Sequence, residues 1–159
     1  MNGMTRIGVA AVGSLILATA AMAQGAGPQT PEQKAQAAVL TRQGLFKVQG
    51  FVFGPVGGML RGGKFDAAVA EKAAQRLQVT GGLIPELFAQ DTHTFTIPTK
   101  AREGIWTNKS DFDAKANDLV KAATDLEAAA KTGDEAATKK AAAGVGKACG
   151  ACHDQFRDK

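Results

Sequence analysis

The chain has 159 residues, with 19 basic and 15 acidic side chains, so its formal net charge is +4. This length corresponds to one domain and leaves no room for a separate catalytic domain. The basic residues are spread along the chain, and so small an excess is too weak to bind nucleic acid. The chain has no Tyr and one Trp and is rich in Ala from residue 114 onward, which favours closely packed helices over a sheet.

Residues 1–23 have the pattern of a cleaved secretory signal peptide. Arg6 precedes an apolar stretch from Ile7 to Ala20, and Ala21-Met22-Ala23 follows as a small-x-small cleavage pattern. The apolar stretch is shorter than the about 20 residues that cross a bilayer, so we expect no stable membrane insertion. We predict an exported, periplasmic protein whose domain comprises residues 24–159. Its net charge is about +3, because Arg6 is the one charged residue that cleavage removes.

The first helix of the domain is predicted to begin at Thr30-Pro31-Glu32-Gln33. Thr30 can cap the helix, proline fits its first position, and the glutamine completes a capping box. Gly50, Gly54 and Pro55 make the second half prone to bend or break. Residues 57–63 are expected to form a loop.

A second helix is predicted to start at Asp66 as its N-cap and to end at Gly81-Gly82. Its helical spacing predicts that it buries Val69, Ala73 and Leu77. A long connection follows, up to Trp106.

The clearest periodicity in the chain follows Ser110 and predicts a third helix. Its apolar residues alternate steps of four and three: Phe112, Ala116, Leu119, Ala123, Leu126 and Ala130. Gly133 ends this helix and Asp134 caps a fourth, whose apolar stripe is Ala137, Ala141, Val145, Ala148 and Cys152. Four such amphipathic helices predict an all-α fold, an antiparallel up-down-up-down four-helix bundle.

The chemistry of the chain is concentrated in Cys149-Gly150-Ala151-Cys152-His153, which matches the Cys-x-x-Cys-His signature for attachment of c-type haem. On a helix, positions i, i+3 and i+4 share one face. Both thiols can therefore reach the two vinyl groups of one haem while the imidazole of His153 binds the iron. We predict one covalent haem c.

Three other interpretations of the two cysteines fit the sequence less well. A thioredoxin-like redox pair belongs at the start of a helix after a strand, and no strand pattern precedes this motif. A zinc site needs about four ligands, and the other histidine, His93, is far away in sequence. A structural disulfide is possible in an oxidising compartment, but it explains neither the adjacent histidine nor the combination of motif and export signal.

The position of the motif limits the sixth ligand of the iron, because six residues follow His153 and none before Lys159 is Met, His or Lys. A distal ligand must therefore come from upstream. Met59 is the one methionine after the signal peptide and lies beyond the middle of the first helix, and His93 is interpreted as a solvated loop residue. The sequence favours an iron with an open or apolar distal face.

Arg42-Gln43-Gly44-Leu45-Phe46-Lys47 resembles the first-helix motif of the cytochrome c′ family. The resemblance implies that Arg42 and Gln43 contact the haem propionates and that Phe46 covers the distal face. Without it, Arg42 and Gln43 would be interpreted as solvated helix residues, and Phe46 as ordinary core.

Two further segments are similar to the same family. Residues 101–106 resemble a segment ending in Ile-Trp beside the haem edge, which implies cofactor contacts from Arg102 and Glu103. The family usually has Pro-Glu before Ile-Trp, whereas Glu103-Gly104 stands here. Residues 149–157 place Arg157 where the family has a basic residue beside the proximal pocket.

The resemblance implies a five-coordinate, high-spin haem protein that acts in one-electron transfer, in binding of NO or CO, or in both. The alternatives are a dedicated NO-buffering protein and a six-coordinate, low-spin carrier on the same bundle. A peroxidase-like enzyme would need a distal acid-base residue, and we expect none and no enzyme. The expected partners are redox proteins and a second copy of the chain, through an apolar face with Phe51, Phe53 and Val56.

Overall fold

The computed structural model describes residues 28–159, so the predicted signal peptide, residues 1–23, lies outside the described residues. Four long helices form the body of the molecule: α1 (Pro31–Leu60), α2 (Ala67–Gly82), α5 (Lys109–Lys131) and α6 (Glu135–Phe156). Two single-turn helices, α3 (Ile84–Leu87) and α4 (Gly104–Thr107), lie in and beside the long connection. This part of the chain contains no β-strand, and none of its helices is both long and apolar enough to cross a membrane.

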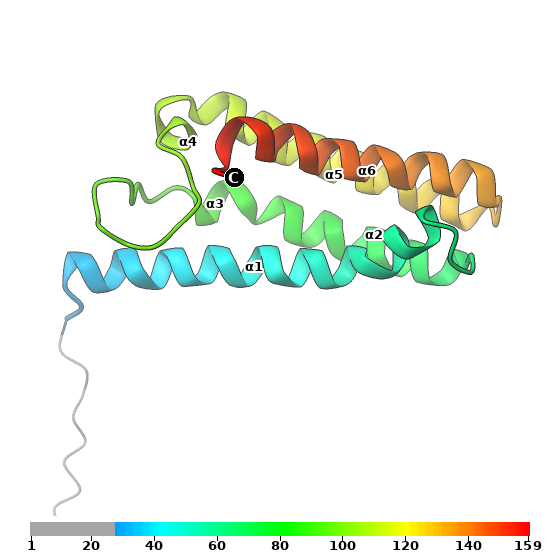
Figure 1. Ribbon diagram of the computed structural model, residues 1–159, viewed down its shortest axis with the longest axis horizontal. Helices are drawn as coiled ribbons and strands as arrows, with labels where there is room; N and C mark the ends of the chain where they lie inside the picture. The colour runs from blue at the N-terminus through cyan, green and yellow to red at the C-terminus, as the bar shows by residue number, and fades with distance from the viewer. Residues whose placement is uncertain (1–27) are drawn as a thin grey trace, which may run out of the picture.

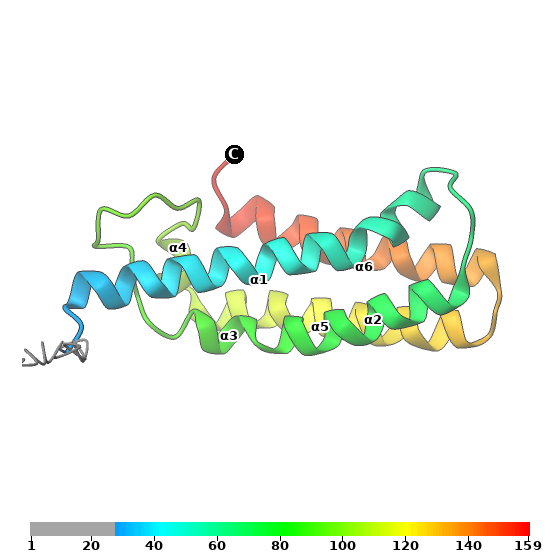
Figure 2. The same ribbon diagram turned by 90° about the horizontal axis from the view of Figure 1, so that it is seen from below.

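The four long helices pack side by side as a bundle (Figures 1 and 2). α2 contacts α1 and α5, and α6 contacts α5 and α1, which closes the ring of neighbours. The α1–α2 and α5–α6 connections both lie at one end, which we call the closed end. The 88–103 connection lies at the other end, beside the last turns of α6, and we call this the open end. The predicted all-α four-helix bundle is confirmed.

Side-chain caps begin three of the helices at the predicted residues. Thr30 forms the capping box of α1 with Gln33. Asp66 accepts a hydrogen bond from the Val69 backbone N–H, and Asp134 accepts one at the start of α6. α5 starts at Lys109, so Ser110 lies within its first turn instead of preceding it.

The predicted loop at 57–63 is wrong in its first half, because α1 continues through Pro55 to Leu60. The last turn of α1 is held by burial: Val56 and Met59 are in the core, and Gly57 is buried as well. Packing of this kind outweighs a low local helix propensity. The turn comes later, at Gly62, whose φ of +93° suits glycine.

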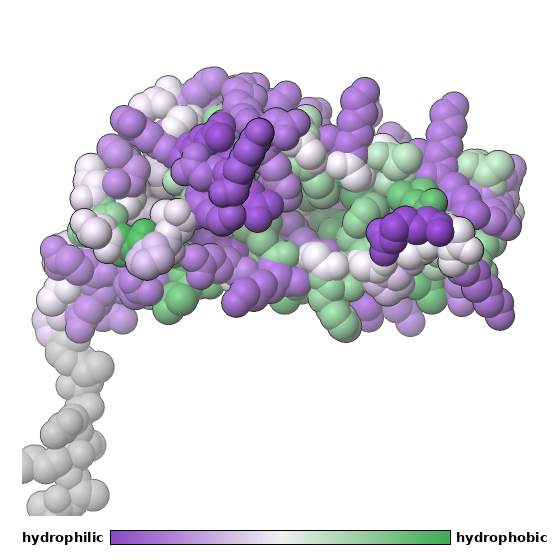
Figure 3. Space-filling view, viewed as in Figure 1, coloured by the Kyte–Doolittle hydropathy of each residue, from purple (hydrophilic) through white to green (hydrophobic). Residues whose placement is uncertain are grey.

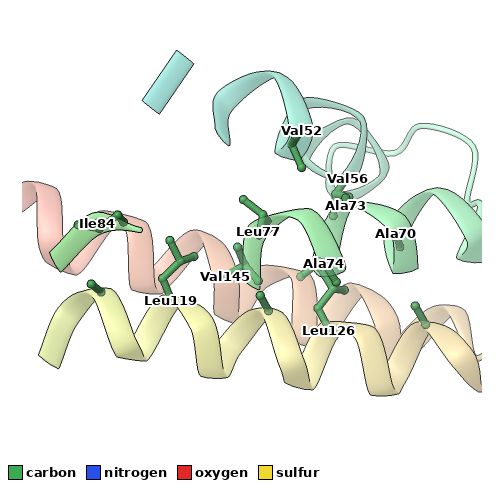
Figure 4. Packing of buried hydrophobic residues seen from close by; sticks show 14 of the residues in the cluster. Val52, Val56, Ala70, Ala73, Ala74, Leu77, Ile84, Leu119, Leu126 and Val145 are labelled. Carbon is green, nitrogen blue, oxygen red and sulfur yellow. The ribbon is translucent and has the colours of Figure 1, made fainter. Parts of the chain in front are cut away.

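The core of the closed end is made of small and medium-sized side chains from α2, α5 and α6, joined by the end of α1 (Figure 4). All six predicted core residues of α5 are buried. In α2, Ala70 takes the place predicted for Val69, which is 37% exposed. In α6, Val145 is buried as predicted, but Thr138 and Ala142 are buried in place of Ala137 and Ala141.

The shift in α6 has a local cause. The hydroxyl of Thr138 donates to the backbone carbonyl of Asp134 at 2.6 Å, so this polar side chain is satisfied inside the core. Ala137, which the hydrophobic pattern favoured, is exposed instead.

Candidate haem site

A cavity of about 770 Å³ opens at the open end of the bundle, between α1, the 88–103 connection and the last turns of α6. Its size lies within the range of cofactor sites. The α1 side is lined by Val39, Arg42, Gln43, Phe46 and Lys47. The connection and α4–α5 contribute Phe88, Pro98, Thr99, Lys100, Ala101, Ile105 and Phe112, and α6 contributes Cys152, His153, Phe156 and Arg157.

The Cys-x-x-Cys-His motif occupies the last turns of α6. Cys152 and His153 line the cavity, and the half-buried Cys149 packs against the core cluster one turn earlier. Both cysteines are free thiols in this structure. Their i, i+3 spacing and the following histidine present two thiols and an imidazole to one site, which is the donor set that covalent haem needs.

Burial sets the protonation of these groups. It raises the pKa of Cys149, and it raises the pKa of Cys152 to about 11. A thioredoxin-like pair requires the opposite shift, and it belongs at the start of a helix, not at its end. Burial also lowers the pKa of His153, with the positive charge of Arg157 adding to the effect. Both effects favour the neutral imidazole, which is the form that binds a metal.

The zinc interpretation finds no site among residues 28–159, where no group of three or more His, Cys, Asp or Glu side chains could hold a metal ion. His93 lies outside the cavity lining. Its Nδ1 is 2.7 Å from the carboxylate of Asp91, and its ring lies beside the indole of Trp106, with centroids 6.1 Å apart.

Phe46 and His153 face each other across the cavity. Their ring centroids are 6.5 Å apart and the planes are inclined at 76°. Phe46 is 36% exposed, so it lies at the mouth of the cavity and not within the closed core. A group bound by the His153 imidazole would meet the Phe46 ring on its other side.

Arg42 holds the connection in place. Its guanidinium is 3% exposed and donates to the carbonyls of Leu87 and Gln90 and to the hydroxyl of Thr92. It also lies over the Phe88 ring, 4.6 Å from the centroid. Burial lowers its pKa, although the negative charge of Asp91 opposes the shift. The predicted propionate contact of Arg42 remains a prediction, since all three nitrogens have partners in the chain.

The other polar residues predicted for the site divide into two groups. Gln43 and Arg157 line the cavity, and Gln43 donates to the carbonyl of Pro98 at 3.2 Å. Arg102 and Glu103 do not line it. Glu103 is exposed, 3.8 Å from Nε2 of His93.

Arg102 binds the end of α6 instead of facing the cavity. It donates to the carboxylate of Asp158 at 2.8 Å and to the last helical carbonyls, those of Asp154 and Gln155. These carbonyls have no partner within the helix, so Arg102 caps it. The residue thereby fixes the turn that carries His153.

A cluster of aromatic rings around the cavity was missed by the sequence reasoning. The Phe88 ring lies 6.1 Å from Phe46 and 4.9 Å from Phe112, and Phe112 lies 5.3 Å from Phe156. Trp106 donates from Nε1 to the carbonyl of Phe88 at 3.0 Å. Phe112 belonged to the predicted stripe of α5, but no periodic signal marks Phe88, because it follows a single helical turn in the connection.

Comparison with known proteins identifies this arrangement. Residues 37–157 match the family described as Cytochrome C′. Cytochrome c′ of Rubrivivax gelatinosus is 34% identical over 128 residues, which cover 80% of this chain and 98% of that protein. Cytochrome c′ of Shewanella frigidimarina superposes with a TM-score of 0.71 at 33% identity, covering 79% of this chain and 97% of that structure.

A nitric oxide complex of a cytochrome c′ point mutant from Alcaligenes xylosoxidans superposes with a TM-score of 0.69 at 28% identity, covering 79% of this chain and 97% of that one. The chain is therefore a c-type haem protein, and it belongs to the cytochrome c′ family. Its cofactor is covalently bound haem c, which the cavity and the donor set of α6 fit.

Proposed function

We propose that the protein is a periplasmic, mono-haem cytochrome with a five-coordinate, high-spin iron, acting in one-electron transfer, in binding of NO or CO, or in both. Cys149 and Cys152 would form the thioether links to the haem, His153 would bind its iron, and Phe46 would lie across the cavity from His153. The position of Phe46 across from His153, with ring centroids 6.5 Å apart, carries this proposal. No methionine and no second histidine is among the described residues that line the cavity.

The haem, the residue that binds its iron and the rings on the opposite side have separate roles. The haem supplies an iron that changes charge by one electron and has an affinity for diatomic ligands. His153, at the lining of the cavity, supplies an imidazole donor from one side. Phe46 and Phe88 present apolar rings on the other side, where they keep bulk water away and offer no ligand atom.

Electron transfer and gas binding draw on different observations. A cofactor in a cavity that opens to the surface, with Lys47 and Lys100 at its lining, suits encounter with a redox partner. The apolar ring opposite His153 suits NO or CO, and a related cytochrome c′ has been solved as a nitric oxide complex. The described cavity lining holds no Asp, no Glu and no second histidine, so a peroxidase-like activity has no support from such a group there.

The test is an absorption and resonance Raman spectrum of the ferrous protein before and after CO is added. We expect a five-coordinate, high-spin spectrum that CO converts to a six-coordinate one. Phe46→Met places a thioether across from His153 and should give a low-spin spectrum without CO, whereas Phe51→Met, on the exposed side of α1, should not. A low-spin spectrum of the unmodified protein would remove the vacant-site proposal and leave the low-spin carrier.

A second copy of the chain is the proposed partner of α1. Phe51 is 79% exposed, and Leu40 and Val48 are exposed on the same helix, so α1 carries an apolar stripe on its outer side. Hydrophobic side chains reach the surface along the edge that α1 forms in Figure 3. The stripe differs from the predicted face, because Val56 is buried in the bundle and Phe53 packs against the core.

Sedimentation velocity tests whether two copies of the chain form a dimer through α1. Phe51→Lys should convert a dimer to a monomer, since a lysine on each copy would meet the apolar stripe of the other. Val79→Lys on α2, at another exposed valine, is the matched control and should leave the dimer intact. Sedimentation of the unmodified protein as a monomer at micromolar concentration would contradict the proposal.

A further inference from the structure

One buried amide in the molecule has no partner. Gln49 on α1 is 8% exposed, and its Nε2 is the one buried side-chain nitrogen or oxygen among residues 28–159 that makes no hydrogen bond. Buried polar groups are nearly always paired, because losing water without gaining another partner is costly. An unpaired donor in the interior therefore indicates an acceptor that the polypeptide does not supply.

The place of Gln49 on α1 indicates where that acceptor lies. Gln49 follows Phe46 by three residues, which is about 4.5 Å along the helix axis and about 60° around it. Arg42, Phe46 and Gln49 follow one another at helical spacing on the inward side of α1. Arg42 and Phe46 line the cavity. Gln49 is not one of its lining residues, but it is the next inward position on α1 toward the closed end, one helical turn from Phe46.

We propose that Gln49 is the distal hydrogen-bond donor of the haem site, with Nε2 donating to the outer atom of a diatomic ligand on the Phe46 side of the iron. The inference rests on the proposed vacant coordination position. The sequence predicted an open or apolar distal face. Gln49 adds a polar group to that face, because its side chain has three rotatable bonds and can extend from the neighbouring turn of α1. Distal donors of this kind govern how a haem site discriminates among gases.

The ferrous CO complex is the probe, and Gln49→Leu is the variant. Leucine removes the amide but adds no iron ligand, whereas methionine at this position could itself bind the iron. A donor to bound CO draws electron density onto its oxygen and weakens the C–O bond. The infrared C–O stretch should therefore move to higher wavenumber in Gln49→Leu. CO dissociation should become about fivefold faster, which corresponds to about 1 kcal/mol.

The control is Gln36→Leu, at an exposed glutamine on the same helix, and it should change neither quantity. The thermal midpoint of the CO-free protein separates a ligand role from a structural one. Because Nε2 has no partner in the chain, Gln49→Leu should leave this midpoint unchanged or raise it. A lower midpoint with an unchanged C–O stretch would overturn the inference and assign Gln49 a structural hydrogen bond, for example to a buried water.

The same samples distinguish failure of this inference from failure of the proposed function. If the unmodified ferrous protein is six-coordinate before CO is added, the proposed function fails and no distal position is vacant for a ligand. If it is five-coordinate but Gln49→Leu leaves the C–O stretch and the dissociation rate unchanged, only the role of Gln49 fails.

Discussion

The two ends of the bundle are built on different principles. At the closed end, short connections bring α2, α5 and α6 together, and side chains such as Ala74, Ala123 and Leu126 are fully buried between them. At the open end, a 16-residue connection, 88–103, replaces the tight turn, and large aromatic rings surround a cavity of about 770 Å³. One end is closed by packing, and the other leaves room for a cofactor.

The contrast also concerns hydrogen bonds. At the closed end the side chains of the core are almost all apolar, with Thr138 bonded within its own helix. At the open end, hydrogen bonds from Arg42 and Arg102 join the connection to α1 and to the end of α6, and Trp106 joins α4 to Phe88 at its start. A region that holds a large ligand cannot rely on close packing, so hydrogen bonds hold its walls in place.

The largest effect is expected from removing the thiols at the open end. In the exported Cys149→Ala/Cys152→Ala double variant, intact-mass analysis should show polypeptide without the added mass of haem, because no thioether can form. His153→Gly is the matched variant, since it removes the iron ligand but should keep the covalent haem mass. Haem mass retained in the double variant would refute attachment at these cysteines.

The closed end should respond most strongly to a cavity in its core. Leu126 is fully buried, so Leu126→Ala should lower the free energy of unfolding by about 3–5 kcal/mol, from lost burial and the void left behind. The haem spectrum should stay unchanged, because the site lies at the other end. Val79→Ala, at an exposed position, should cost less than about 0.5 kcal/mol. Chemical denaturation of the haem protein measures both, and a changed spectrum in Leu126→Ala would show that the ends are coupled.

The sequence predicted local features, such as the core of α5 and the helix caps, better than contacts between distant segments. The spacing from Phe112 to Ala130 marks the core of α5 because helical periodicity reports burial against neighbouring helices. The caps Thr30, Asp66 and Asp134 are equally local, since each depends on residues within one turn.

The residues missed at the open end depend on contacts distant in sequence. Arg42 meets Thr92 across 50 positions, and Phe88 lies in a connection without any period, so no local pattern indicates either contact. The motif of Cys149, Cys152 and His153 could be recognised because its chemistry is contained in five consecutive residues. Gln49 has no local signature, because only the folded structure identifies its amide as buried and unpaired.

An intermediate effect is expected where α1 holds the connection. Arg42→Leu removes three hydrogen bonds to residues 87–92 and leaves their acceptors without the guanidinium, so the free energy of unfolding should fall by about 2 kcal/mol. Limited proteolysis should then cut first within 88–103, since the tie of this segment to α1 is lost. Arg76→Leu on exposed α2 surface is the control and should show neither change. Unchanged protection of 88–103 in Arg42→Leu would mean that the aromatic rings alone hold the connection.

The smallest effect is expected from a polar contact on the surface of the closed end. Glu127 on α5 accepts hydrogen bonds from Lys131, Gln78 and Gln75, and these lower its pKa from 4.5 to about 2. Because the carboxylate is more acidic in the folded state, its stabilisation is fully present above the unfolded pKa of 4.5 and is lost as the pH falls toward 2.

Glu127→Gln should therefore lower the thermal midpoint slightly at pH 7, and the difference from the unmodified protein should shrink between pH 4.5 and pH 2. Asp125→Asn, at an exposed carboxylate two residues away, is the matched control. Midpoints measured across this pH range test the claim. A difference that stays constant down to pH 2 would assign the effect to lost packing, and the closed end would then owe its stability to apolar contacts alone.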